Sequence, residues 1–551
     1  MMSKKEIILI LTVLLQCTVI FAQDELKKEV EVTKAYEPVV KESNKINELP
    51  EITDTVSYVP DLKFDIQTRP VQTSFETEPL KAATMVGEPL TKLYNKYVNL
   101  GFGGFLTSRA DIGISTLRSK EYLAGGYYNH YSTFGKIKLV DGTKTDAPFS
   151  DNSMTIFGTK FLENSILSGE FDLFTKRRQF YGYNPASSDI LGSVESRRIR
   201  YNAMDLAIDY KSNYNDSLHL NYDVRFNYYF FTDDDRNYEN LIHIQGQFDK
   251  FFRTEMAGLD FDSKYYDRSQ KLDDENHFII KIAPWIGKFG VRWQVKAGFQ
   301  VVSYNSSNQS GSYIYPKASL QYNIVENIVV PYAGVDGNLQ VNSLRSSRGE
   351  NPFLNRSVII SNTDNKLLLF SGIRGNLSSK TSFNIRYTYQ VTDSMYFFVN
   401  EGSLGNSFNV LYDDEIINHF FGEFDTELFE RFTFGIKGNY FDYNLEKLQF
   451  AWHRPDFDLR ISAGYNFMNK VIMNTEFFAI GQRKVTSSNS PGLYNVLDGA
   501  VDVNFRLQYN YTKILNFYLH LYNITSNQYS LWQFYPVQPF NVLVGVRYSF
   551  N

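Results

Sequence analysis

The sequence has one cysteine among its 551 residues, Cys17. A single cysteine cannot form a disulfide framework within the chain, and it leaves no cysteine-based metal or thiol chemistry to expect after residue 17. A chain of this length without disulfides must be held together by its fold.

Long apolar runs are absent after residue 22. No window there approaches the roughly 20 consecutive apolar residues that a membrane-spanning helix needs. The net charge of -5 is mild, so it gives no argument for binding nucleic acid. Membrane spans, where they occur after residue 22, must therefore be built from strands.

Motifs of catalytic and metal sites are missing as well. There is no P-loop, G-x-S-x-G or H-E-x-x-H, and the 7 histidines are scattered without metal-ligand spacing. Acidic clusters occur at 233–235, 273–275 and 413–415, but they lack the spaced pattern of a calcium loop, and solvated loops are the simpler interpretation. We expect no enzyme activity, no metal site and no cofactor.

The N-terminus has the order of a secretory signal peptide. Lys4 and Lys5 precede an apolar run over 7–21, and the small residue Ala22 follows. This pattern predicts a signal peptide over residues 1–22. A membrane anchor is the alternative, but the run is short for a spanning helix and charges follow it at once. A lipoprotein site at Cys17 is a lesser alternative, because Gln16 is a poor residue before a lipidated cysteine.

Residues 23–95 differ in composition from the rest of the chain. They are rich in charge and contain regularly spaced prolines, namely Pro38, Pro50, Pro60, Pro70, Pro79 and Pro89. Prolines at this spacing prevent long helices and central strands. We predict an extended, partly disordered arm in the periplasm, with a folded domain as the alternative.

Aromatic residues and strict alternation are what the chain has in abundance from residue 96 onward. Aromatics make up 16% of the sequence, with 39 tyrosines and 45 phenylalanines. Apolar and polar residues alternate through 218–230, 383–391, 432–440 and 501–511. A period of two predicts strands with one apolar and one polar face. In a membrane barrel the apolar face contacts lipid and the polar face lines the interior.

Short and long connections alternate between these strands. The longer links run over 138–151, 178–196, 266–275, 341–363, 395–408, 444–457 and 484–498. Outer-membrane barrels have short periplasmic turns and long surface loops. The fold predicted for residues 96–551 is therefore an all-β, antiparallel transmembrane barrel of about 22 strands, since an even count places both ends of the barrel in the periplasm.

Alternation also predicts which side chains face the interior. The ionisable candidates are Asp223, Arg225, Arg386, Lys437, Asp502, Arg506 and Arg547. They either line a solute path of mixed charge or form polar networks that hold the wall together. Aromatic residues near strand ends fit the interfacial girdles of such barrels, and they include Tyr228, Tyr229, Tyr509, Tyr511, Trp532 and Tyr535.

The C-terminal stretch 523–550 resembles the end of TonB-dependent receptors. Asn523, Asn527 and Tyr529 match an "N-L-x-N-x-x-Y" motif, and Pro539, Gly545, Tyr548 and Phe550 match the final-strand motif. Tyr548 and Phe550 resemble the terminal signal read by the outer-membrane assembly machinery. Phe540 replaces the family's arginine, and Asn551 follows the usual last aromatic. The F-A-Q end of the signal peptide and the high Tyr and Asn content look like a protein of Bacteroidota.

The resemblance implies an outer-membrane receptor that transports a solute, in contact with outer-membrane lipid and lipopolysaccharide. Residues 23–95 are too few for that family's plug domain and lack its glycine-rich pattern. Glu29, Val30, Glu31, Val32 and Thr33 are a weak match for a segment that pairs with TonB by strand addition. A wide lumen must be filled by the arm, by surface loops or by a partner. The alternative function is a scaffold in a biogenesis or export complex, closed by periplasmic or surface lipoproteins.

Overall fold

The barrel is the part of the chain that the computed structural model describes. The described residues are 93–185, 197–214, 219–269, 276–306, 310–325, 327–401, 404–429, 431–486 and 493–551. The predicted signal peptide, nearly all of the predicted arm and the segment Glu29 to Thr33 lie outside them.

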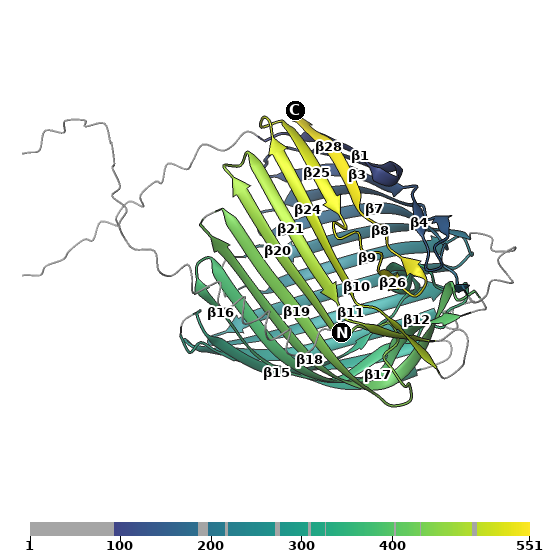
Figure 1. Cartoon of the computed structure of the whole chain (residues 1–551). Helices are drawn as coiled ribbons and strands as arrows, with labels where there is room; N and C mark the ends of the chain where they lie inside the picture. Colours follow the sequence, from purple (N-terminus) through teal and green to yellow (C-terminus); the bar gives the residue numbers. More distant parts are fainter. Residues whose placement is uncertain are drawn as a thin grey trace, which may run out of the picture. The chain divides into compact units, whose positions relative to one another are not determined.

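One antiparallel sheet of 22 strands forms the wall (Figure 1). This confirms the predicted fold class and strand count. Its strands are β1 (Lys96–Gly103), β2 (Thr107–Ser115), β3 (Tyr122–Thr133), β6 (Phe149–Phe161), β7 (Ser165–Gln179), β8 (Arg198–Ser212), β9 (Asn221–Asp233), β10 (Tyr238–Phe252), β11 (Glu255–Arg268), β12 (Asn276–Phe289), β13 (Trp293–Ser306), β14 (Ser310–Tyr322), β15 (Val330–Gln340), β16 (Thr363–Ser378), β17 (Thr381–Glu401), β18 (Ser407–Leu428), β19 (Phe432–Leu445), β20 (Phe457–Phe467), β21 (Val471–Ile480), β24 (Ala500–Asn510), β25 (Leu515–Tyr522) and β28 (Asn541–Phe550).

The first and last strands close the barrel. β1 pairs with β28 over its whole length, from Lys96 opposite Phe550 to Gly103 opposite Leu543. Closure leaves the sheet without an open edge, which is the condition for a strand-built membrane span because every backbone group then finds a partner.

Smaller elements lie in the connections. They are η2 (Gly104–Leu106), α2 (Leu344–Glu350) and the three short hairpins β4 (Lys136–Lys138) with β5 (Lys144–Asp146), β22 (Arg483–Thr486) with β23 (Tyr494–Leu497), and β26 (Ser530–Trp532) with β27 (Tyr535–Pro536). In the part of the chain that the structure describes, no helix combines the length and apolar character needed to cross a membrane.

The two ends of the barrel differ in their connections. The turns 162–164, 379–380 and 468–470 lie at one end, which we call the short-turn end, together with Phe550. The connections with α2 and the three short hairpins lie at the other, the loop end (Figure 1). The predicted link 395–408 was wrong in its length, because β17 and β18 continue through most of it. Asp393 and Ser394, which are typical turn residues, lie in a register irregularity between Thr392 and Met395.

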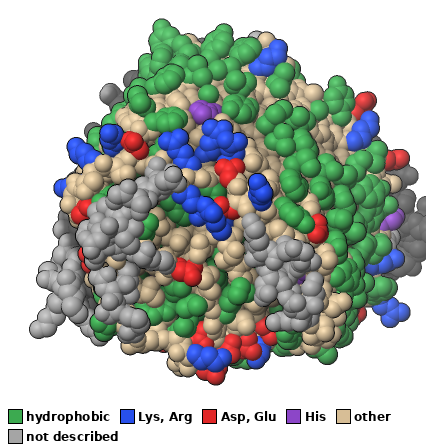
Figure 2. Space-filling view, turned by 90° about the vertical axis from the view of Figure 1, so that its right-hand side faces the viewer, with side chains coloured by type: hydrophobic (Ala, Val, Ile, Leu, Met, Phe, Trp, Pro, Cys, Tyr) green, Lys and Arg blue, Asp and Glu red, His purple; other side chains and the backbone are tan. Residues whose placement is uncertain are grey.

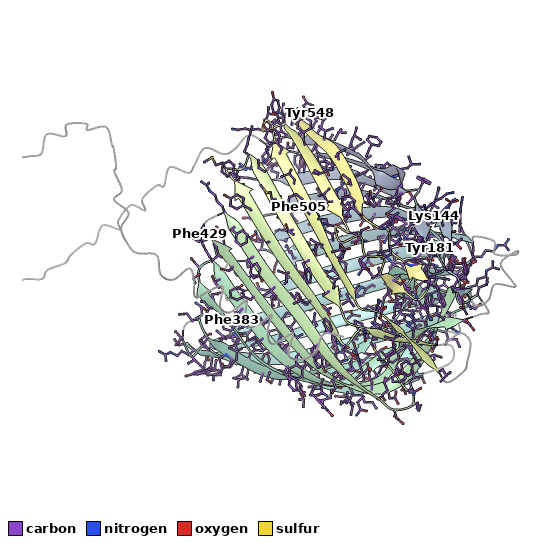
Figure 3. All side chains as sticks on the ribbon, in the orientation of Figure 1. Lys144, Tyr181, Phe383, Phe429, Phe505 and Tyr548 are labelled. Atoms are coloured by element: carbon purple, nitrogen blue, oxygen red, sulfur yellow. The ribbon has the colours of Figure 1, made fainter. Side chains whose placement is uncertain are left out.

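The outer face of the wall is apolar. Ile114 on β2 and Val544 on β28 are 55% and 54% exposed, and they belong to a continuous row of exposed Leu, Ile, Val and aromatic side chains. In water an exposed apolar surface of this size would be unfavourable, whereas lipid tails cover it in a bilayer. Figure 3 marks Phe505 on β24 and Tyr548 near the end of β28 within this wall. The barrel is thus a transmembrane barrel with its polar rows inside.

Candidate functional site

A hydrophobic core lies at the loop end of the barrel, where loop segments meet the inner wall. We call the segments 341–362 and 523–540 the cap. Phe353 and Tyr535, one from each segment, stack with ring centroids 3.7 Å apart, and Tyr181 meets Tyr535 edge-on at 4.9 Å. Figure 3 places Tyr181 among the densely packed side chains of this end. Cap residues also pack against wall residues such as Ile199 and Val302 in one buried cluster.

Helix α2 is fixed to the wall by carboxylates of three strands: Asp205 in the middle of β8, Asp233 at the end of β9 and Glu239 near the start of β10. The guanidinium of Arg345 forms two hydrogen bonds with Asp205, at 2.5 and 2.7 Å. Arg348 pairs with Asp233 at 3.3 Å, and the two side chains are 1% and 0% exposed. Charged pairs with so little water contact are expensive to separate, because each partner would remain buried without its counter-ion.

Glu239 on β10 holds the start of the same helix. Its carboxylate accepts the backbone N–H of Leu344 at 2.9 Å and pairs with Arg268 at 2.9 Å. Tyr229 donates its hydroxyl to the same carboxylate at 2.6 Å. Together with Asp205 and Asp233, Glu239 forms a group of acidic wall residues that we call the latch.

His453 lies in the connection 446–456 and is buried beside the cap. Its Nδ1 is 2.8 Å from the carbonyl oxygen of Phe398, and its ring lies 5.5 Å from that of Trp532 in the cap. Burial lowers the pKa of His453 to about 3, with Arg483 and Arg454 contributing in the same direction. The ring is therefore neutral near pH 7 and donates its Nδ1 proton to the carbonyl.

Two recesses adjoin on the inner wall. One has a volume of about 780 Å³ and is lined mainly by Ser, Thr and Asn side chains with Arg506 and Glu476. The other has a volume of about 520 Å³ and is lined by aromatic side chains of the cap and the wall, including Trp532 and Tyr535. Asn504 on β24 lines both, so the two recesses are neighbours on the inner wall.

The face that carries the long loops is charged. In Figure 2 Lys and Arg side chains gather toward its middle with Asp and Glu among them, while hydrophobic side chains gather along its upper and right-hand rims. The loop end therefore presents a surface of mixed charge with apolar rims.

Solved structures share this architecture. The FrpB iron transporter from Neisseria meningitidis (F3-3 variant) matches with a TM-score of 0.66 at 11% identity, over 84% of this chain and 82% of that one. The siderophore receptor PirA from Acinetobacter baumannii matches with a TM-score of 0.63 at 10% identity, over 84% and 81%. The chain therefore shares the barrel fold of this iron transporter and this siderophore receptor.

A third structure agrees. The pyoverdine outer-membrane receptor FpvA from Pseudomonas aeruginosa PAO1 matches with a TM-score of 0.62 at 10% identity, over 84% of this chain and 79% of that one. No protein-family model matches the chain, and no curated protein matches it in sequence. At such low identity the likeness establishes the fold. The three structures are named as a transporter and receptors, and none as an enzyme.

The sequence-predicted interior residues are spread around the wall and do not form one cluster. Arg506 lies 3.9 Å from Glu476 in the polar recess, and Asp502 accepts the hydroxyl of Tyr529 at 3.1 Å in the aromatic one. Arg386 and Lys437 share one aromatic neighbour: their charged groups lie 5.7 and 5.2 Å from the centre of the Phe421 ring.

The remaining predicted residues have partners of their own. Arg225 lies 3.5 Å from Asp209, and Arg547 lies over the ring of Tyr97 at 4.6 Å. Asp223 stands opposite Lys211 in the pairing of β9 with β8. Their part in a solute path stays a prediction.

At the C-terminus, Tyr548 and Phe550 stack with ring centroids 5.6 Å apart on β28. Recognition of this pair by the assembly machinery stays a prediction. The resemblance motif has a structural role as well: Asn523 donates to the carbonyls of Asn527 and Gln538 at 3.0 and 2.8 Å, which ties together the cap segment 523–540.

Three of the predicted girdle aromatics lie elsewhere. Tyr229 is buried inside the barrel against Glu239, while Trp532 and Tyr535 belong to the cap. The prediction was wrong for these residues because an aromatic next to a strand end can turn inward as readily as toward the membrane interface. Tyr509 and Tyr511 are exposed on the outer side near the short-turn end.

The latch was missed by sequence reasoning. The acidic cluster at 233–235 is predicted to be a solvated loop, and this is wrong: Asp233 is buried against Arg348, and Asp235 pairs with Arg197. The signal that could have revealed the latch is the pair of arginines, Arg345 and Arg348, spaced by three residues in the longest link. Among the described residues, no group of three or more His, Cys, Asp or Glu side chains could hold a metal ion.

Proposed function

We propose that the chain is an outer-membrane protein that admits a solute through the barrel, with the cap as its gate. The loop end faces the outside and the short-turn end faces the periplasm, as the lengths of the connections favour. The observation that carries the proposal is the pair of neighbouring recesses that share Asn504, the aromatic one beneath the cap and the polar one toward the short-turn end. A solute released by the cap would enter the aromatic recess and continue into the polar one.

Opening the gate requires the latch to release α2. Breaking one buried ion pair by removing a partner costs about 3–5 kcal/mol, so spontaneous opening is rare and an energy input or a ligand has to drive it. This agrees with use of TonB, which would engage residues of the segment Glu29 to Thr33 in the periplasm.

The remainder of residues 23–95 has its place in the same proposal. Their prolines and charges suit an extended arm, and the lining of the polar recess offers hydrogen-bonding side chains to such a chain. We propose that part of the arm lies across the periplasmic mouth. Deleting residues 24–90 should then raise antibiotic uptake, and unchanged permeability would exclude the arm as a stopper.

The second candidate function is a scaffold in an envelope-biogenesis or export complex. The ion pairs of the latch favour it, because Arg348–Asp233 and Arg268–Glu239 are almost fully buried and suit a permanently closed mouth. Isolation from membranes separates the two functions. Stoichiometric periplasmic or surface lipoprotein partners favour the scaffold, and a lone barrel that conducts favours transport.

The gate is tested by unlatching it. In planar bilayers the purified full chain with Asp233→Asn and Glu239→Gln should show at least about tenfold more open time than the wild type, because both buried pairs lose a charge. The control carries Glu163→Gln and Glu255→Gln, which remove two carboxylates of the short-turn end, one in the turn 162–164 and one in an exposed ion pair with Lys288 at the start of β11. If the unlatched variant conducts no more than the control, the cap is not a gate.

A further inference from the structure

A row of charged and polar side chains crosses five neighbouring strands of the wall. Asp262 on β11 stands directly opposite Lys281 on β12. Gln300 follows on β13, and the ammonium group of Lys317 on β14 lies 3.4 Å from the Oε1 atom of Gln300. Asp336 on β15 completes the row. The order of the side chains across the wall is therefore acidic, basic, neutral, basic and acidic.

The row faces the interior of the barrel and lines a recess there. Two positions nearer the loop end on β12, β13 and β14 lie Ile279, Val302 and Tyr315, which belong to the buried cluster of the cap. Side chains two positions apart share a face of a strand, so the row lies on the short-turn side of that cluster. The recess has a volume of about 270 Å³ and shares no lining residue with the polar or the aromatic recess. We call it the third recess. Sites for drug-sized ligands have volumes of about 300–1,000 Å³, so the third recess suits a smaller solute.

Two buried polar atoms of the third recess have no hydrogen-bond partner in the part of the chain that the structure describes. One is the amide nitrogen Nε2 of Gln300, a residue that is only 7% exposed. The other is the Oδ1 atom of Asp262, whose Oδ2 atom lies 3.1 Å from His243 and 3.8 Å from Lys264. Burying a donor or an acceptor without a partner is unfavourable. The third recess therefore suits an occupant that supplies both an acceptor and a donor.

The two lysines of the row supply further donors. Lys281 donates to the carbonyl of Leu339 at 3.0 Å, and Lys317 approaches the amide oxygen of Gln300. Among the described residues, neither lysine forms an ion pair with a carboxylate. In the order of the strands the two ammonium groups lie on either side of Gln300, so three donors surround the middle of the third recess. Such a group of donors matches a carboxylate, which accepts several charge-assisted hydrogen bonds.

The spacing of the strands sets the length of the occupant. Asp336 accepts the N–H of Gly337 at 2.8 Å, whereas Asp262 keeps one oxygen without a partner and is the better site for a cation. Neighbouring strands are about 4.8 Å apart, so the backbones of Asp262 and Gln300, two strands apart, are separated by about 10 Å. An extended dipeptide covers about 7 Å, and the hydrogen bonds at its ends cover the rest. A single amino acid is too short.

We propose that the third recess binds a small zwitterionic solute of the size of a dipeptide. The carboxylate of the solute lies between Lys281, Lys317 and the Nε2 atom of Gln300. Its ammonium group is bound by the free Oδ1 atom of Asp262. Both buried atoms that lack a partner then have one, and the charges of the two lysines are balanced. The inference rests on the proposed entry of a solute into the barrel, and it names the chemical class of that solute.

The test is isothermal titration calorimetry of the purified full chain in detergent, with alanyl-alanine as the probe. Alanyl-alanine amide lacks the carboxylate, and N-acetyl-alanyl-alanine lacks the ammonium group. Each should bind at least about tenfold more weakly than alanyl-alanine, because charge-assisted hydrogen bonds are lost. The titrations are repeated on the variant Asp233→Asn with Glu239→Gln, so that a closed cap cannot keep the probe from the recess.

Variants of the chain test the same contacts from the other side. Gln300→Leu removes the free donor, and Lys317→Gln removes one ammonium group, so each should weaken the binding of alanyl-alanine at least about tenfold. The matched control is Lys288→Gln, which removes a lysine from the same strand as Lys281, in an exposed ion pair with Glu255 at the short-turn end. The control should bind alanyl-alanine as the wild type does.

The outcomes separate the site from its ligand and from the gate. Equal affinity for alanyl-alanine and its N-acetyl form would leave an anion site and overturn the zwitterion. Absence of saturable binding by the folded wild type and the folded unlatched variant would overturn the site, as would unchanged binding by folded Gln300→Leu and Lys317→Gln. Thermal unfolding checks the fold of each variant. Bilayer conductance is measured separately, so a chain that binds alanyl-alanine but never conducts keeps the third recess as a site and loses the proposed transport.

Discussion

Arg348 and Asp233 meet at 3.3 Å although 115 residues separate them in the sequence, and water reaches almost none of either side chain. The contact fastens the cap to the wall. Replacing Arg348 with Leu leaves the buried carboxylate of Asp233 unpaired, so we expect a loss of about 3–5 kcal/mol in the stability of the cap. Guanidinium titration of the purified barrel, read by protease cleavage within 341–362, measures that loss.

Arg345→Leu is the companion variant for this experiment. Its side chain is 30% exposed, so water can solvate Asp205 after the substitution, and the loss should be about 1 kcal/mol or less. Equal effects of the two variants would contradict the role assigned to burial.

The assignment of faces on β24 can be tested with adjacent residues. Phe505 belongs to the lipid-facing row and Arg506 to the lining of the polar recess. Phe505→Arg places a charge in lipid at a penalty of about 2–4 kcal/mol near the midplane, so the fraction of folded barrel in the membrane should fall. Arg506→Gln should assemble normally. Heat-modifiable mobility on gels measures both, and normal assembly of Phe505→Arg would show the faces to be reversed.

Acid should loosen the cap through His453. The pKa of His453 is about 3 while it is buried beside the folded cap and about 6.5 when it is exposed, so His453 binds a proton more readily once the cap has opened. The contribution of neutral His453 to the stability of the cap is constant above about pH 6.5, and the cap loses this stability as the pH falls from about 6.5 toward 3. Protease cleavage within 341–362 should therefore increase over that window in the wild type. His453→Asn removes the titrating group, so the variant should have a flatter profile; an unchanged profile would assign the acid response to other groups.

Position 523 requires a residue that tolerates a left-handed backbone and donates side-chain hydrogen bonds, and Asn does both. Its φ of 48° lies in the left-handed region, and its side-chain amide donates to two carbonyls of the cap. Asn523→Ala should destabilise the cap by about 1–3 kcal/mol, since two acceptors are left without their donor. Asn523→Asp tolerates the same backbone conformation but lacks the donors, so it separates the two effects. If Asp restores full stability, the hydrogen bonds contribute little.

The wall of the barrel could be predicted from the sequence because the faces of each strand depend only on residues that are close together in the chain. Alternation fixes which residues share a face, and in 501–511 every second residue falls in the apolar outer row. The alternation of short and long links fixes the two ends. The link 395–408 was an exception: Asp393 and Ser394 are typical turn residues, but the structure absorbs them into a bulge, with Ser394 at a φ of 55°, and the strands continue.

The cap could not be predicted from the sequence because its contacts join residues that are far apart in the chain. Phe353 and Tyr535 stack although they lie in different links of the chain, and neither belongs to a periodic pattern. The sequence of a link does not show whether an aromatic side chain there faces a ligand, the membrane interface or the barrel interior. The arginines of α2 could suggest acidic partners, but three neighbouring strands have to pair before Asp205, Asp233 and Glu239 lie together as those partners.

β17 and β18 are 21 and 22 residues long, about twice the length that a bilayer requires. At about 3.4 Å per residue and the usual tilt, they rise about 50 Å, while the apolar band of such barrels is about 25 Å tall. In the orientation proposed here, the paired ends of β17 and β18 extend beyond the membrane into the sugar layer of the cell surface. An antibody or a phage tail fibre that approaches the cell therefore reaches this paired extension without entering the membrane.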